Sequence, residues 1–131
     1  MAQVKIIAPQ TREAEHLRVA AYCRVSSDSK DQLHSYAAQI HSYTEEIAQH
    51  DGWELVDVYA DEGLTGTRMD KREDFNRMMR DCRKGKIDRI LVKSVSRFAR
   101  NTKDCLSALR ELSGMGVTVR FEKENIDTGT L

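Results

Sequence analysis

An arginine and a serine stand two residues apart in the segment Tyr22-Cys23-Arg24-Val25-Ser26. In an extended strand, side chains alternate between two faces, so Tyr22, Arg24 and Ser26 are predicted to share one face. A fixed guanidinium beside a hydroxyl suits attack on a phosphate, because the arginine fork can hold two phosphoryl oxygens while the hydroxyl approaches phosphorus. The same residues also fit a plain strand end, with a surface arginine and a serine that caps the next helix.

A basic turn follows later in the chain, from Ser96 to Arg100, with Lys93 just before it. On one helical turn Arg97 and Arg100 would share a face, and Phe98 would anchor the turn in the core. Two guanidinium groups without an intervening acid fit a phosphate or its transition state, in which charge collects on the equatorial oxygens. An exposed basic patch is the alternative.

The polar segment 61–71 is long enough to be a functional loop, and it leads to Arg72. Taken alone, it is a flexible loop followed by a charged helix start. Asp28, Asp61 and Glu62 can ligate a metal if the protein is a nuclease, although acids in turns and loops are more often solvated. Cys23, Cys82 and Cys105 are odd in number and form no Cys-x-x-Cys pair, so no disulfide framework or zinc site is predicted.

Apolar periodicity predicts the elements that position these segments. Strands are expected at 19–25, 53–59, 87–92 and 117–121, and helices between them that end at Gly52, Gly85 and Gly114. In the second strand, alternation places Trp53, Leu55 and Asp57 on one face and Glu54, Val56 and Val58 on the other. In the last helix, Leu106, Leu109 and Leu112 form the predicted apolar stripe.

Strands that alternate with helices predict an α/β fold, with a mainly parallel sheet of four or five strands and helices on both faces. Sites in such folds gather at the carboxyl ends of the strands. That rule selects the segments after Val25, Tyr59 and Val92, which are the three polar segments described above.

Composition sets the broad class. The chain has 131 residues, of which 40% are hydrophobic, and its 21 Lys and Arg balance 21 Asp and Glu. This length suits one domain, predicted at 17–131 after a polar extension at 1–16. No apolar run approaches the length of a membrane span, and no secretory signal is recognised, so a cytoplasmic protein is predicted. Zero net charge argues against a strongly basic DNA binder, so a nucleic-acid role must rest on local charge or on a segment beyond this chain.

Three motifs in order resemble the catalytic domain of the serine recombinases, above all the large transposon- and phage-type integrases. They are Tyr22-x-Arg24-Val25-Ser26, the segment Asp61-Glu62-Gly63-x-Thr65-Gly66 with Arg72, and Ser96-Arg97-Phe98-Ala99-Arg100-Asn101. The resemblance implies that Ser26 is the nucleophile that attacks a DNA phosphate, leaving a 5′-phosphoserine and a free 3′-hydroxyl. It implies that Arg24, Arg97 and Arg100 hold the non-bridging oxygens and that Arg72 completes one cationic nest.

The resemblance also implies supporting roles for Tyr22 and Gln39. Thr65 stands where the family usually has serine, and Ser96 where many members have aspartate, so the proton donor to the leaving 3′-oxygen is unassigned. Neither metal nor ATP is implied, because arginine stays charged at any working pH and the phosphoserine bond conserves the energy of the phosphodiester.

The implied partners are double-stranded DNA at recombination sites and further copies of the chain, as a homodimer that forms a tetramer on synapsis. A DNA-binding region would follow the catalytic domain. The alternative is a non-catalytic α/β module that binds a phosphorylated ligand or a partner protein through the same arginines, and a metal-dependent nuclease is a third hypothesis.

Overall fold

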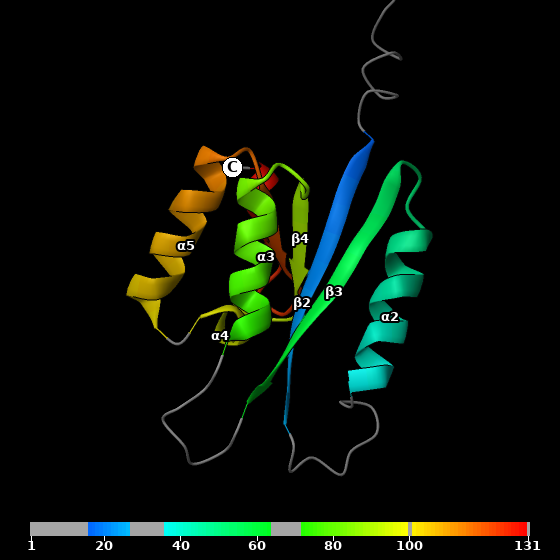
Figure 1. Ribbon diagram of the computed structural model, residues 1–131, viewed down its shortest axis with the longest axis horizontal. Coiled ribbons are helices and arrows are strands. Elements are labelled where there is room, and N and C mark those ends of the chain that lie inside the picture. Colours follow the sequence, from blue (N-terminus) through cyan, green and yellow to red (C-terminus); the bar gives the residue numbers. More distant parts are fainter. Residues whose placement is uncertain (1–15, 27–35, 64–71, 100, 131) are drawn as a thin grey trace, which may run out of the picture.

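The computed structural model describes residues 16–26, 36–63, 72–99 and 101–130. Within them, five strands form one sheet with helices on both faces (Figure 1). The strands are β2 (Leu17–Ser26), β3 (Trp53–Gly63), β4 (Arg89–Val92), β5 (Thr118–Phe121) and β6 (Ile126–Asp127). The helices are α2 (Tyr36–Ala48), α3 (Glu73–Arg83), α4 (Val95–Phe98) and α5 (Thr102–Gly114), and a 3-10 turn, η2, covers Thr128–Thr130. Among these helices, none is both long and apolar enough to cross a bilayer.

The strand order is β3-β2-β4-β5-β6, with β2 to β5 parallel and β6 antiparallel to β5. This confirms the predicted mainly parallel α/β sheet. The chain passes from β3 across β2 to β4, so the strand order reverses direction between β2 and β4, where open α/β sheets place their sites. Arg24 and Ser26 lie at the carboxyl end of β2, and α4 follows β4 at the same edge of the sheet (Figure 1).

The side chains of β2 alternate between two cores, as predicted. Tyr22 faces α3 and α5, in a cluster that contains Met78, Phe98 and Phe121. Cys23 faces α2, in a smaller cluster with Tyr43, Ile47 and Leu91. Figure 1 shows α2 on one side of the sheet and α3 and α5 on the other. Since each fully buried large apolar side chain contributes about 1.5–3 kcal/mol, the two clusters fix which face each strand residue takes.

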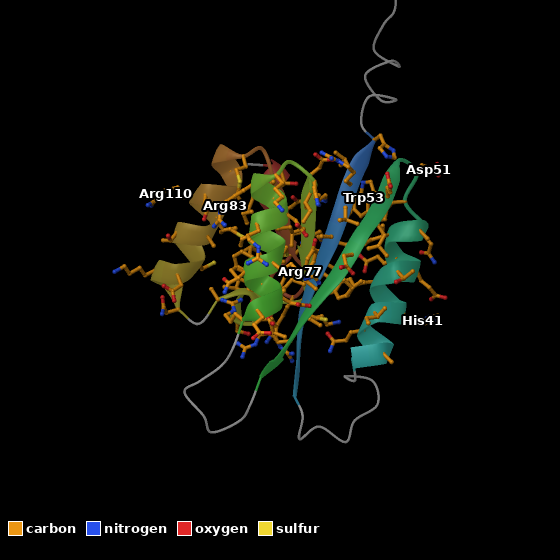
Figure 2. All side chains as sticks on the ribbon, viewed as in Figure 1. His41, Asp51, Trp53, Arg77, Arg83 and Arg110 are labelled. Atoms are coloured by element: carbon orange, nitrogen blue, oxygen red, sulfur yellow. The ribbon has the colours of Figure 1, made fainter. Side chains whose placement is uncertain are left out.

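The alternation predicted for β3 holds through Val56, which faces α3 opposite Leu55 as expected, and is wrong from Asp57 onward. The register with β2 shifts next to Val56, and one extra residue turns the following side chains to the opposite faces. Val58 therefore packs on the α2 side, with Leu55. Asp57 faces α3, where it accepts a hydrogen bond at 3.1 Å from Arg77, which is directed toward β3 (Figure 2).

The apolar stripe predicted for α5 is wrong at Leu106, which is 50% exposed. Cys105 is buried in place of Leu106. Leu112 is buried as predicted, and Leu109 is half-buried against the larger core. Leu106 and Leu112 are six residues apart, which turns an α-helix by about 600° and puts the two side chains on different faces.

β2 begins at Leu17, the residue where the domain is predicted to start. The predicted extension, except His16, lies outside the described residues, so the division at residue 16 stays a prediction. Cys23, Cys82 and Cys105 are buried free thiols. Gly85, two residues after the end of α3, has φ of 76°, a left-handed conformation that glycine adopts without strain.

Candidate active site

Arg72 directly precedes α3, and its guanidinium packs among aromatic rings. The Cζ atom lies 3.8 Å from the centroid of the Phe75 ring and 5.5 Å from that of Tyr22. Nη2 donates to the backbone carbonyl of Phe98 and, at 3.4 Å, to the Tyr22 hydroxyl. Its Nε is buried and has no hydrogen-bond partner among the residues that the structure describes. Arg72 thus joins β2, the start of α3 and the turn after β4.

Asp61 lies near the end of β3, is only 6% exposed, and accepts three hydrogen bonds. The Tyr22 hydroxyl donates to its Oδ2 at 2.7 Å. The backbone N–H groups of Asp74 and Phe75 donate to its two oxygens at 2.8 and 3.0 Å. Those amides belong to the first turn of α3, where N–H groups lack partners within the helix and carry the positive end of the dipole. Asp61 therefore caps α3 from the neighbouring strand.

The Tyr22 hydroxyl is a permanent donor in this arrangement. Burial raises the pKa of Tyr22 far above its usual value, and the hydrogen bond to Asp61 acts in the same direction, whereas the charge of Arg72 opposes both. The phenol stays protonated at physiological pH, so it donates to Asp61 and offers a lone pair to Arg72.

Arg97 lies in α4 and turns toward α2. Its Nη1 donates to the backbone carbonyl of Arg24 at 2.7 Å. Beside it is a cavity of about 310 Å³, whose lining comes from α2, from the turn after β4 and from the end of β5. The lining residues are Ala38, Gln39, Ser42, Tyr43, Glu46, Lys93, Arg97 and Glu122. The Tyr43 hydroxyl is buried in this wall without a hydrogen-bond partner in the described part of the chain.

The cavity carries both signs of charge. Lys93 Nζ lies 4.0 Å from Glu122 Oε1, and the acid Glu46 also lines the cavity. Burial raises the pKa of Glu122, and the nearby Glu46 carboxylate raises it further. In the described ranges, no group of three or more His, Cys, Asp or Glu is arranged to hold a metal ion.

The structure locates only some of the residues that the sequence selected. Arg24 and Ser26 pair with Asp61 and Gly63 across β2 and β3, and Arg24 is half-exposed. Ser96 is exposed on α4, with its Oγ 3.1 Å from Ser94 Oγ. The side chain of Ser26, together with Thr65 and Arg100, lies outside the described residues. Their roles stay predictions, as do those of Tyr22, Arg24, Gln39, Arg72, Ser96 and Arg97.

One geometric expectation for the basic turn is corrected. The helical turn that carries Arg97 ends at Phe98, because Ala99 is extended, with φ −149° and ψ 153°, and Arg100 lies outside the described residues. Arg72 reaches the carboxyl edge of the sheet from the side of α3, and Arg97 reaches it from the side of α2; the convergence of both with Arg24 and Arg100 in one nest stays a prediction. The predicted anchor is confirmed, since Phe98 is buried with ring centroids of Phe75 and Phe121 both at 5.4 Å.

Sequence reasoning missed the role of Asp61 and the contribution of Tyr43, Glu46 and Glu122 to the cavity. The sequence pattern assigns Asp61 to the polar loop. In the structure Asp61 belongs to β3, and its carboxylate accepts a hydrogen bond from the buried Tyr22 hydroxyl. Once the register shift in β3 is known, alternation puts Asp57, Tyr59 and Asp61 on the face of α3. That shift is the only signal that could have found Asp61, and it is invisible in the local sequence.

The fold and site define a class: an open α/β sheet with arginines at the carboxyl edge, where the strand order reverses. The sequence model of the resolvase N-terminal domain matches residues 19–131. A resolvase family site-specific recombinase from Streptococcus pneumoniae has a TM-score of 0.69 and 34% identity, covering 88% of this chain and 78% of that chain. No curated protein sequence gives a significant match. The chain belongs to the resolvase family and is a serine recombinase catalytic domain.

Two further solved structures are similar. The N-terminal catalytic domain of TP901-1 integrase has a TM-score of 0.67 and 26% identity, covering 86% of this chain and 82% of that chain. The C-terminal catalytic domain of ISC1926 TnpA, an IS607-like serine recombinase, has a TM-score of 0.65 and 22% identity, covering 81% and 69%. At that identity the last comparison supports the fold alone.

Proposed function

We propose that the domain breaks and rejoins DNA strands at recombination sites, with Ser26 as the nucleophile. The observation that carries this proposal is the hydrogen bond from Arg97 to the Arg24 carbonyl, at the end of the strand that carries Ser26. It joins α4, which follows β4, to the carboxyl end of β2 at the point where the strand order reverses. Membership of the resolvase family supports the same reaction class.

In the proposed reaction, the Ser26 hydroxyl oxygen bonds to phosphorus, and the bond from phosphorus to the 3′-oxygen breaks. The hydroxyl proton is lost from serine, and the leaving 3′-oxygen gains one, which yields a 5′-phosphoserine and a 3′-hydroxyl. Religation reverses these steps with the 3′-hydroxyl of another strand. Arg24, Arg72, Arg97 and Arg100 would neutralise the charge on the non-bridging oxygens, and guanidinium groups do so without a change of protonation.

The substrate is double-stranded DNA in the cytoplasm, handled by a dimer that synapses into a tetramer. With a net charge of zero, the domain lacks the excess of cations that non-specific DNA affinity requires. We therefore assign most of the non-specific DNA affinity to a further region of the protein. To this domain we assign the binding and reaction of the single phosphate at which a strand is cleaved.

The test is a covalent-trapping assay with the protein as its gene encodes it. The substrate is a nicked DNA duplex that carries the recombination site to which the protein binds. Wild-type protein should form a covalent adduct that survives denaturation and chelator. Ser26→Ala should abolish it while DNA binding persists, and Ser27→Ala is the matched control that should retain it. An adduct that persists in Ser26→Ala would refute the assignment. No adduct with wild type would favour a binding module, and loss of cleavage with chelator would favour a metal-dependent nuclease.

A further inference from the structure

Asp61 is a buried carboxylate, and none of the roles proposed above involves it. We propose that Asp61 is a positioning residue for Arg72, fixing its guanidinium at the carboxyl edge of the sheet through the Tyr22 hydroxyl and the first turn of α3. This inference rests on the proposed function for its effect on DNA cleavage. The contacts that carry it belong to this chain alone.

The first link runs through Tyr22. Its side chain is fully buried, so its hydroxyl needs a partner inside the protein, and Asp61 provides one at 2.7 Å. This bond fixes the rotation of the hydroxyl, which leaves a lone pair for Arg72 Nη2 at 3.4 Å. The Tyr22 ring also forms part of the aromatic wall around the guanidinium.

The second link runs through the start of α3. Asp61 accepts from the amides of Asp74 and Phe75, two and three residues beyond Arg72. The backbone from which the Arg72 side chain emerges is therefore tied to β3. The hydrogen bond from the Phe75 amide to Asp61 also holds Phe75 in place. The Phe75 ring lies under the guanidinium, with 3.8 Å between Arg72 Cζ and the ring centroid. One carboxylate thus sets both the origin of the Arg72 side chain and the surface on which it rests.

Arg72 carries this constraint to the basic turn. Its Nη2 donates to the Phe98 carbonyl, and Phe98 follows Arg97 in α4. Asp61 connects β3 to β2 and to the start of α3, and Arg72 extends this chain of polar contacts to α4. A shift of α3 relative to β3 would move the Arg72 guanidinium, because Arg72 directly precedes α3 and its guanidinium rests on Phe75 of that helix.

A helix cap of purely structural value would give a different result from a positioning residue. Losing a cap lowers the free energy of unfolding, and any effect on cleavage would then be independent of Arg72. A residue that acts through Arg72 has no further effect once Arg72 is gone. A double-mutant cycle separates the two, because it measures the coupling between the sites.

The test measures single-turnover adduct formation by the naturally encoded protein for wild type, Asp61→Asn, Arg72→Ala and the double variant. Asp61→Asn keeps the size of the side chain and one acceptor oxygen but removes the charge. It should slow adduct formation about tenfold, the scale of one charge-assisted hydrogen bond. In the Arg72→Ala background the same substitution should change the rate less than about twofold. Equal effects in both backgrounds, or no effect in either, would overturn the proposal.

Asp57→Asn is the matched control, because Asp57 lies on the same strand and face but pairs with Arg77 near the surface. It should leave the rate within about twofold of wild type. If Asp61→Asn does not fold, Tyr22→Phe takes its place: it removes the hydroxyl link and leaves the helix cap. If Tyr22→Phe slows adduct formation in the presence of Arg72 but not in the Arg72→Ala background, the proposal is supported. If Tyr22→Phe slows adduct formation in the Arg72→Ala background as well, the proposal is contradicted.

A second readout does not depend on catalysis. The Nε–H resonance of Arg72, assigned by its absence in Arg72→Lys, should shift in Asp61→Asn and stay in place in Asp57→Asn. An unchanged resonance in Asp61→Asn would overturn the positioning role. If wild type forms no Ser26-dependent adduct, the proposed function fails, while the resonance still tests the link between Asp61 and Arg72.

Discussion

Replacing Arg89 by leucine should destabilise the domain by about 3 kcal/mol, because it breaks a largely buried ion pair. Arg89 of β4 reaches across β5 to β6. Its Nη1 donates to Thr118 Oγ1 and Asp127 Oδ1, both at 3.0 Å, and its Nη2 donates to Asp127 Oδ2. The two side chains of the pair are only 11% and 17% exposed. This bidentate contact adds a side-chain tie to the backbone pairing that holds the two-residue strand β6 to β5.

The magnitude follows from what Asp127 loses in Arg89→Leu. Removing one partner of a buried pair costs about 3–5 kcal/mol, because the other charge stays desolvated. Asp127 keeps the hydrogen bond from the Gly129 amide at 2.9 Å and some contact with water, which favours the lower end of that range. For a domain whose total stability is about 5–15 kcal/mol, this loss is large.

The loss should depend on pH. The hydrogen bond from Arg89, more than any other cause, lowers the pKa of Asp127. A lowered carboxyl pKa stabilises the folded state above the unfolded pKa of about 4, and this contribution disappears as pH falls through the folded pKa. The difference between wild type and Arg89→Leu should therefore be largest near neutral pH and shrink toward about pH 3.

Urea denaturation followed by circular dichroism and by Trp53 fluorescence measures these differences at both pH values. Arg83→Leu is the control, because the Arg83–Glu111 pair is close, at 2.8 Å, but its side chains are 52% and 42% exposed. It should cost less than about 1 kcal/mol. The reasoning is refuted if Arg89→Leu costs no more than Arg83→Leu, or if its cost is the same at both pH values.

Two further predictions concern stability. Burial and the neighbouring Glu46 raise the pKa of Glu122, so ionisation of Glu122 opposes folding as pH rises past its unfolded pKa. Glu122→Gln should therefore stabilise the domain more at pH 7 than at about pH 4 in urea titrations, and equal differences would contradict this. Gly116 has φ of 77°, so Gly116→Ala should cost about 1 kcal/mol, whereas Gly114→Ala, on helix α5 with open space around it, should gain up to about 1 kcal/mol. Thermal melts of Gly116→Ala and Gly114→Ala measure the two changes in stability. Shifts of the melting temperature in the same direction for both variants would refute this reasoning.

Local patterns were sufficient wherever the determinants of structure are local. The apolar run that contains Tyr22 and Cys23 predicts β2 and its alternation, and the glycine after α3 predicts where that helix ends. The faces predicted for β3 from Asp57 onward are wrong because the register shift is a property of the pairing with β2. The helical turn predicted around Arg97 is present as α4, but its end at Phe98 was not predicted, because the extended backbone at Ala99 has no signal in the surrounding residues.

The candidate site shows the same limit. The three segments were predicted from their polar residues and from the rule that sites lie at the carboxyl ends of strands. Asp61 was not recognised as a structural carboxylate, because its partners lie 39, 13 and 14 residues away along the chain. Which of several acids turns inward depends on the packing of distant elements, and spacing along the sequence does not encode it.

The position of α4 makes the two faces of the sheet interdependent at this site. Arg72 reaches the edge from the side of α3 and donates to the Phe98 carbonyl, while Arg97, the residue before Phe98, donates to the Arg24 carbonyl beside α2. Both guanidinium groups therefore use neutral main-chain acceptors. A phosphate oxygen is a stronger acceptor for a guanidinium than a carbonyl oxygen, because it carries negative charge and can take the bidentate geometry. Under the proposed function, a phosphate next to the end of β2 would compete with both carbonyls for these guanidinium groups, and α4 links the two exchanges, since this short helix holds one arginine and the acceptor of the other.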